Sequence, residues 1–139
     1  MTPKDDTWKA RCEAGFLAQG VMGTLGVRIV SLDPGRMVFE MPFAAGFTQQ
    51  HGFLHAGTVT TVLDSACGFA ALSLMPADRE VWTVEFKANF LAPGRGGMFR
   101  FEGEVVKAGR TLSVTRGSAF ADGVEISTMQ ATMMAVAMP

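Results

Sequence analysis

The sequence has few of the residues that mark metal, disulfide or nucleic-acid sites. Of its 139 residues only Cys12 and Cys67 are cysteines. They lie far apart and form no CxxC pair, so we expect neither a disulfide framework nor a zinc site. Nothing else in the sequence requires a metal or an organic cofactor. Acidic and basic residues are mixed, the net charge is −1 and there is no basic block, which argues against a nucleic-acid partner. Two reduced thiols fit a cytoplasmic protein.

Long hydrophobic runs are also scarce. Residues 1–13 are polar and charged, unlike a secretory signal. The segment 52–77 is long enough for a membrane span of roughly 20 residues. However, it is rich in Gly, Ala, Ser and Thr and carries Asp64 near its middle. We therefore expect a helix buried inside the protein and no membrane partner. The length of the chain favours a single domain over residues 1–139.

The hydrophobic pattern of the sequence predicts helices and strands in a definite order. A helix is predicted over 7–22 with Thr7 as its N-cap, and a long helix over 57–75 after a loop. Turn signals occur at 33–35 and at Asp122-Gly123, the second typical of a type I′ hairpin. The predicted strands cover residues 27–32, 36–43, 81–92, 98–107, 110–121 and 124–137.

The strands predict how the long helix is covered. Regular alternation over 81–92 would place Trp82, Val84, Phe86, Ala88 and Phe90 on one face. Four such strands after one apolar helix indicate an α+β fold, with an antiparallel sheet curled around the helix. A sheet covers only one side of a helix that is apolar almost all round. We therefore expect a second copy to cover the rest, giving a homodimer or a dimer of dimers.

Asp64 is the residue that points most directly to chemistry. A carboxylate in the middle of an apolar helix is costly to desolvate without partners. Helical spacing puts it beside Thr60, Gly68 and Ala71, whose small side chains leave room for a ligand. Such a group can act as a general base or nucleophile with a perturbed pKa. The structural alternative is an acid satisfied by a neighbouring hydroxyl or arginine.

The start of the long helix is a second candidate. Ala56 and Gly57 are expected to present backbone N–H groups where the helix dipole favours negative charge. This is either an oxyanion hole for acyl transfer or an ordinary helix start. Of the two preceding histidines, His51 is expected to bond the loop backbone. For His55 that role, ligand positioning and acid–base chemistry all stay open.

A basic turn is the third candidate. Lys107, Ala108, Gly109, Arg110 and Thr111 combine two cations with an exposed glycine backbone between two predicted strands. Such a turn could hold phosphate groups. A solvated β-turn is the commoner origin of the same pattern.

Three segments in register resemble the PaaI-like acyl-CoA thioesterases of the hotdog superfamily. Residues 55–68 resemble that family's HGG motif, followed by an acid seven residues later and a small-residue helix. Residues 84–93 resemble its strand that ends in an aromatic residue and a proline, and 106–112 resemble its basic turn. The resemblance covers about residues 20–137. It implies the hotdog fold, a long helix wrapped by an antiparallel sheet, paired into dimers and often tetramers.

The resemblance also implies a role for each matched residue. Asp64 matches the carboxylate that activates water or attacks the thioester carbonyl, and Ala56 the residue whose backbone N–H polarises that carbonyl. Gln49 falls where many relatives carry an Asn that orients the water or the substrate. Thr83 lies near a hydroxyl that some relatives contribute across the dimer. Residues 107–111 match a segment that contacts the CoA nucleotide.

The resulting hypothesis is hydrolysis of an acyl-CoA to the free acid and CoA, with CoA as part of the substrate. Two departures from the family pattern are expected to shift substrate choice or rate: Ala56 stands for the first Gly of HGG, and Gln49 is one methylene longer than Asn. The rivals are a hydratase or dehydratase that pairs His55 with Asp64, and a non-catalytic acyl-CoA-binding module. The apolar residues expected around the acyl group are Phe47, Phe53, Leu54 and Met75.

Overall fold

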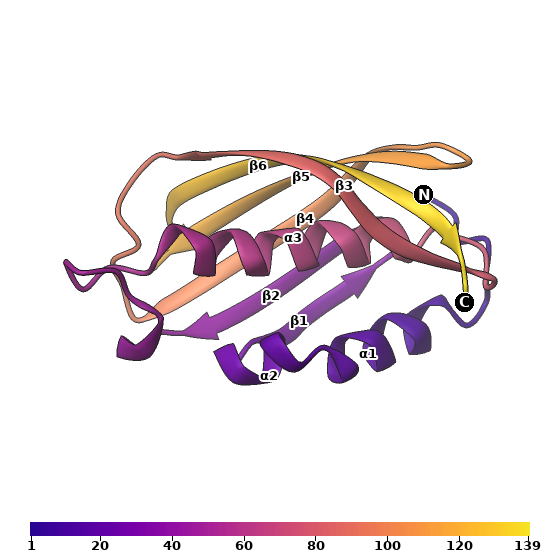
Figure 1. Cartoon of the computed structure of the whole chain (residues 1–139). Helices are drawn as coiled ribbons and strands as arrows, with labels where there is room; N and C mark the ends of the chain where they lie inside the picture. The colour runs from indigo at the N-terminus through magenta and orange to yellow at the C-terminus, as the bar shows by residue number, and fades with distance from the viewer.

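The computed structural model describes all residues 1–139 and consists of a long helix wrapped by a sheet (Figure 1). Two N-terminal helices, α1 (Trp8–Ala18) and α2 (Gly20–Leu25), precede strands β1 (Arg28–Asp33) and β2 (Arg36–Pro42). The 3-10 helix η1 (Ala45–Phe47) and the central helix α3 (Ala56–Leu72) follow. The last four strands are β3 (Arg79–Phe90), β4 (Met98–Ala108), β5 (Leu112–Ala121) and β6 (Val124–Ala137). None of the helices has both the length and the apolar character that a membrane crossing requires.

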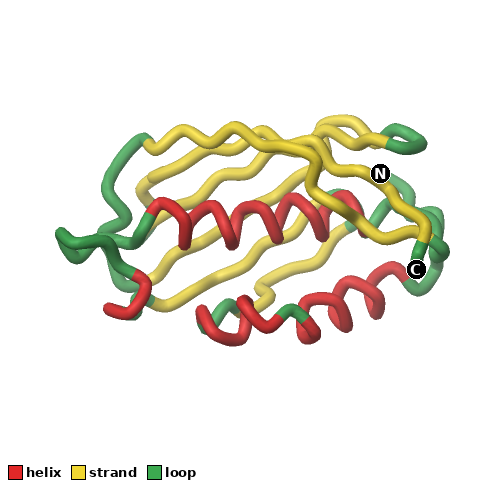
Figure 2. The backbone as a smooth tube through the Cα atoms, viewed as in Figure 1, coloured by secondary structure: helices red, strands yellow, loops and turns green.

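The six strands form one antiparallel sheet in the order β1-β2-β4-β5-β6-β3. The sheet curls around α3, as Figure 2 shows, and leaves β1 and β3 as its edges. Asp122 and Gly123 have φ angles of 45° and 84°, which confirms the predicted type I′ turn between β5 and β6. The α+β arrangement predicted from the sequence, the hotdog fold, is confirmed.

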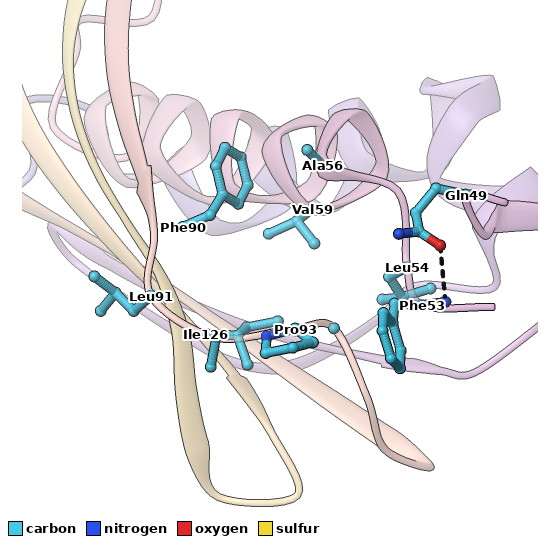
Figure 3. A pocket seen from close by; sticks show the side chains of 11 residues that line it. Gln49, Phe53, Leu54, Ala56, Val59, Phe90, Leu91, Pro93 and Ile126 are labelled. Atoms are coloured by element: carbon cyan, nitrogen blue, oxygen red, sulfur yellow. Dashed lines mark hydrogen bonds between the residues drawn. The ribbon is translucent and has the colours of Figure 1, made fainter. Parts of the chain in front are cut away.

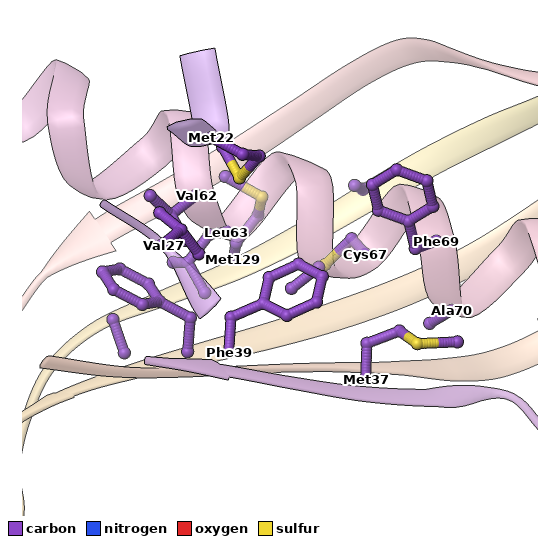
Figure 4. Close-up of a cluster of buried hydrophobic side chains, with 14 of the residues drawn as sticks. Met22, Val27, Met37, Phe39, Val62, Leu63, Cys67, Phe69, Ala70 and Met129 are labelled. Atoms are coloured by element: carbon purple, nitrogen blue, oxygen red, sulfur yellow. The ribbon is translucent and has the colours of Figure 1, made fainter. Parts of the chain in front are cut away.

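The core lies between α3 and the concave face of the sheet (Figure 4). Alternate residues of β2, among them Met37 and Phe39, are completely buried against the helix. The closest approach is at Gly103 of β4, where an added Cβ would lie 2.4 Å from the carbonyl carbon of Ala66. Glycine is required there because the helix and the strand touch through their backbones.

The N-terminal helices cover a side of α3 that was expected to face only a second copy. The Phe16 ring of α1 packs 6.4 Å from Phe69 of α3, between ring centroids. The Arg11 guanidinium donates hydrogen bonds to the carbonyl oxygens of Leu72 and Pro76 at the C-terminal end of α3. The chain therefore supplies part of that cover itself and leaves the N-terminal half of α3 more exposed.

The predicted helix over 7–22 is interrupted. Gln19 is extended, with φ −79° and ψ 101°, and separates α1 from α2. Gly20 and Gly23 lie within α2, and glycine has a low helix propensity, so the local sequence favours this helix only weakly. Thr7 does precede α1, but its hydroxyl donates to Asp5 rather than capping the helix.

The predicted alternation along β3 is also wrong, because the strand contains a β-bulge. Thr83 pairs with Met133 and Glu85 with Thr132, so Val84 has no partner on β6. The extra residue reverses which side chains face the helix. Before the bulge Thr83 points toward α3, and after it Phe86 and Phe90 do. Trp82, expected on the same face as Phe86, is 64% exposed and lies on the other side of the bulge from it.

Candidate active site

The site is centred on Asp64, the only charged residue of α3. Its carboxylate is partly buried and accepts a 2.7 Å hydrogen bond from the Thr83 hydroxyl through Oδ1. No lysine or arginine forms a salt bridge with it. Burial raises the pKa of Asp64 above its ordinary value, and the bond from Thr83 partly opposes this shift. A carboxylate in this setting can serve as a general base toward a bound water.

Two open clefts give access to this carboxylate. The first, of about 380 Å³, lies between α3 and β3 and is bounded by Thr83, Val81 and Phe69. The second, of about 290 Å³, lies toward the start of the helix, beside Thr60 and Phe86. Asp64 therefore faces solvent on two sides and is available to a substrate.

The nearby thiol does not compete with this carboxylate as a nucleophile. Cys67 lies one helical turn from Asp64 but is completely buried. Burial raises the pKa of the Cys67 thiol to about 12, so it stays protonated at neutral pH. Of these two groups, the carboxylate is therefore the candidate for the chemistry.

The start of α3 holds one free amide rather than two. His55 is the N-cap, and its Nδ1 accepts a 2.8 Å hydrogen bond from the Gly57 backbone N–H. A neutral ring in this position carries its proton on Nε2. The Ala56 N–H makes no hydrogen bond within the chain. Ala56 thus offers the donor that a carbonyl oxygen needs, while His55 and Gly57 satisfy each other.

Gln49 is fixed as a second donor beside Ala56. Its Oε1 accepts hydrogen bonds from the backbone N–H groups of His51, at 2.5 Å, and Phe53, at 3.3 Å. The Nε2 amide group is left to face a cavity of about 460 Å³ (Figure 3). The oxygen of the amide is already occupied, so Gln49 presents hydrogen to a ligand.

That cavity is mainly apolar. Besides Gln49 and Ala56, its lining comprises Phe53, Leu54, Val59, Phe90, Leu91, Ala92, Pro93, Gly94 and Ile126. Phe53 and Leu54 were expected in such a lining. Phe47 and Met75 were expected too but are not part of it, and Met75 lies buried beyond the opposite end of α3.

The free amide and the carboxylate do not meet within one chain. Ala56 and Asp64 are eight residues apart on the same helix, which separates them by about 12 Å at ~1.5 Å per residue. A carbonyl carbon and its oxygen are only about 1.2 Å apart. One chain therefore places the two groups too far apart to act together on a single carbonyl.

The basic turn lies apart from both groups. Residues 107–111 are all exposed, and they form the end of the β4–β5 hairpin that projects beyond the sheet in Figure 1. Gly109 donates its N–H to the Leu112 carbonyl, at 2.9 Å, and closes the turn. Neither Lys107 nor Arg110 forms a salt bridge, so both charges remain open to an anion.

Two residues at the Asp64 site were not predicted from the sequence. Gln19 and Ser65 line both clefts that expose the carboxylate. The Ser65 hydroxyl donates a 2.6 Å hydrogen bond to Gln19 Oε1. No sequence signal marked Gln19, because a glutamine inside a predicted helix is ordinary.

Comparison with known proteins gives a consistent result. Residues 51–127 match the family model described as thioesterase superfamily. A provisionally named esterase of Saccharolobus solfataricus is 37% identical over 79% of this chain and 78% of its own length. A 1,4-dihydroxy-2-naphthoyl-CoA hydrolase of Listeria monocytogenes is 27% identical over 68% of this chain and 77% of its own length.

Solved structures agree with the fold. A crystal structure of a thioesterase family protein from Silicibacter pomeroyi has a TM-score of 0.91 at 53% identity, over 94% of this chain and 99% of that one. The PaaI protein of the Escherichia coli phenylacetic acid degradation operon has a TM-score of 0.86 at 19% identity, over 94% of both chains. The second likeness shows a shared fold.

Proposed function

The chain belongs to the thioesterase superfamily and is a thioester hydrolase, and we propose that it hydrolyses an acyl-CoA to the free acid and CoA. The observation that carries the proposal is Asp64, a half-buried carboxylate that faces open clefts, has no cation partner and is held by Thr83. The Listeria relative is named as a hydrolase of a CoA thioester, which supports CoA as the carrier.

In the proposed reaction Asp64 acts as general base. It takes a proton from a water molecule while the water oxygen attacks the thioester carbonyl carbon. The negative charge that develops on the carbonyl oxygen is stabilised by the Ala56 N–H and the Gln49 side-chain amide. Collapse of this intermediate breaks the carbon–sulfur bond, and the thiolate takes up the proton held by Asp64. The products are the carboxylic acid and CoA.

The 12 Å gap within one chain leads us to propose a homodimeric site. In a two-fold dimer whose α3 helices pack antiparallel, an axis near Thr60 would place Ala56 of one copy beside Asp64 of the other. The stripe of Gly57, Thr60 and Thr61 beside Asp64 is small enough for close helix approach. The edge strand β3 also carries exposed apolar side chains, including Val84 and Phe86, that a second copy would cover.

The basic turn completes the proposal for CoA. Lys107 and Arg110 would contact the phosphates of the nucleotide, because both are exposed and unpaired. Phosphate binding of this kind weakens as salt is added. The acyl group would occupy the apolar cavity beside Gln49 and Ala56.

Thiol release tests the proposal. The substrates are short, medium and long aliphatic acyl-CoAs and an arylacetyl-CoA, each matched with the same acyl group on N-acetylcysteamine. We expect turnover of at least one acyl-CoA, with a lower KM than its cysteamine counterpart. Release from the cysteamine thioesters alone would contradict CoA recognition, and release from no thioester would contradict the activity.

A further inference from the structure

Gln19 occupies an unusual position beside Asp64. It is the one residue that interrupts the N-terminal helix, and no proline accounts for the interruption. Its extended backbone lets the side chain leave the helix direction and reach Ser65, the residue that follows Asp64. The interruption thus brings a polar side chain to the residue next to Asp64.

The orientation of the Gln19 amide is set by one hydrogen bond. Ser65 donates to Gln19 Oε1 at 2.6 Å, so the oxygen is the amide atom turned toward Ser65. The two hydrogens on Nε2 have no acceptor within the chain. Gln19 makes no direct bond to Asp64, although both line the same two clefts. Both side chains are therefore open to a molecule that enters either cleft.

A water molecule bound to both side chains would have the hydrogen bonds that the reaction requires. It donates one hydrogen to Asp64 and accepts one from Gln19 Nε2, which leaves a second lone pair for the carbonyl carbon. The Thr83 hydroxyl is already committed to Asp64 Oδ1, so it leaves Oδ2 for the water. Two fixed contacts define the direction from which the oxygen attacks.

We propose that Gln19 is a further catalytic residue, whose side-chain amide, oriented by Ser65, holds the water that Asp64 activates. This rests on the proposed role of Asp64. The net reaction is unchanged: the water proton moves to Asp64, the carbon–oxygen bond forms, the carbon–sulfur bond breaks and the thiolate takes the proton. Gln19 remains neutral and supplies geometry.

Gln19→Met tests the proposal, because methionine is similar in length but has no amide hydrogens. We expect kcat to fall by about 10- to 100-fold, as for a reacting group misplaced by about 1 Å, with KM and Tm nearly unchanged. Ser65→Ala should lower kcat less. The double variant should be no slower than Gln19→Met alone, because both changes act on the same contact between the Gln19 amide and the water. Leu17→Ala, 81% exposed on α1, is the matched control and should behave as wild type.

Two outcomes would overturn the inference. One is a Gln19→Met enzyme with kcat within twofold of wild type. The other is a double variant whose loss of kcat is the product of the two single losses, together with a clearly lower Tm for Gln19→Met. That result would indicate a structural contact. Asp64→Asn is measured alongside. If Asp64→Asn is inactive and Gln19→Met is normal, only this inference fails, whereas a fully active Asp64→Asn would remove the proposed function itself.

Discussion

The Thr83 hydroxyl donates a 2.7 Å hydrogen bond to Asp64 Oδ1 and so links the edge strand β3 to the middle of α3. The link depends on the bulge at Val84. Without the bulge, regular alternation along β3 would place Thr83 on the face opposite to Phe86 and Phe90, away from the helix. The bulge thus lets one strand contribute a hydroxyl to the carboxylate and aromatic side chains to the neighbouring clefts.

Replacing Thr83 with Val should move the pH dependence of the reaction. Burial raises the pKa of Asp64 and the bond from Thr83 opposes this, so loss of the hydroxyl raises the pKa further. The acid limb of kcat/KM against pH should therefore shift to higher pH. Thr128→Val, on the outer face of β6, is the matched control. An unshifted limb in the Thr83 variant would argue against Asp64 as the titrating base.

Replacing Ala56 with Pro removes the free amide hydrogen and puts the ring Cδ in its place. Proline is favoured at the first position of a helix, and the preceding His55 already has the extended conformation that proline requires, with φ −61° and ψ 139°. We expect an unchanged Tm and a kcat lower by about 10²- to 10³-fold, as for loss of an oxyanion donor. Ala56→Ser retains the N–H and should stay active. Equal activity of the two variants would exclude the Ala56 amide from the reaction.

Mixing two inactive variants tests whether the site spans two chains. In a mixed dimer of Asp64→Asn and Ala56→Pro, one site combines both lesions and the other has neither. Random exchange makes half of the dimers mixed, and each keeps one of its two sites, so about a quarter of wild-type activity should return. The measurement is thiol release after partial unfolding and refolding of the mixture. No recovery in a mixture shown to contain mixed dimers would place each site within one chain.

Gly103→Ala should destabilise the fold. The added Cβ would lie 2.4–2.6 Å from backbone atoms of Ala66 and Cys67, so α3 must move off the sheet. Overpacking of this kind typically costs about 1–3 kcal/mol in the free energy of unfolding. Gly23→Ala in α2 meets nothing within 4 Å and should be neutral or stabilising. Denaturant unfolding compares the two, and equal stabilities would contradict the tight contact.

The element order and the fold were predictable, because the alternation of β2 and the turns at 33–35 and 122–123 are local signals. Asp64 was a candidate on similarly local grounds, because it is a single charge in an apolar helix. The bulge at Val84 was not predictable, since it shows only in the pairing of β3 with β6. The direction of the Thr83 side chain follows from that pairing.

The hydrogen-bond assignments at the site also required the structure. The sequence predicts two helix N-terminal amides, but His55 Nδ1 takes the hydrogen of Gly57 and leaves Ala56 alone. It places Gln49 near the site without saying which amide atom is free. Gln19 depends on a contact across 46 residues of sequence, which no local pattern encodes.

The most direct test of the account is thiol release by Asp64→Asn, compared with wild type on the best acyl-CoA of the panel. Asparagine can still accept the Thr83 hydrogen bond but cannot take a proton. The pKa of Asp64 is higher in the folded state than in the unfolded chain. The stability of the wild-type protein therefore falls as the pH rises above the pKa of the unfolded state and the buried carboxylate ionises. Asparagine stays neutral, so the variant should melt at the same temperature or higher at neutral pH. We predict a loss of kcat of about 10²- to 10⁴-fold in this intact fold. Near wild-type release by Asp64→Asn would contradict the central claim.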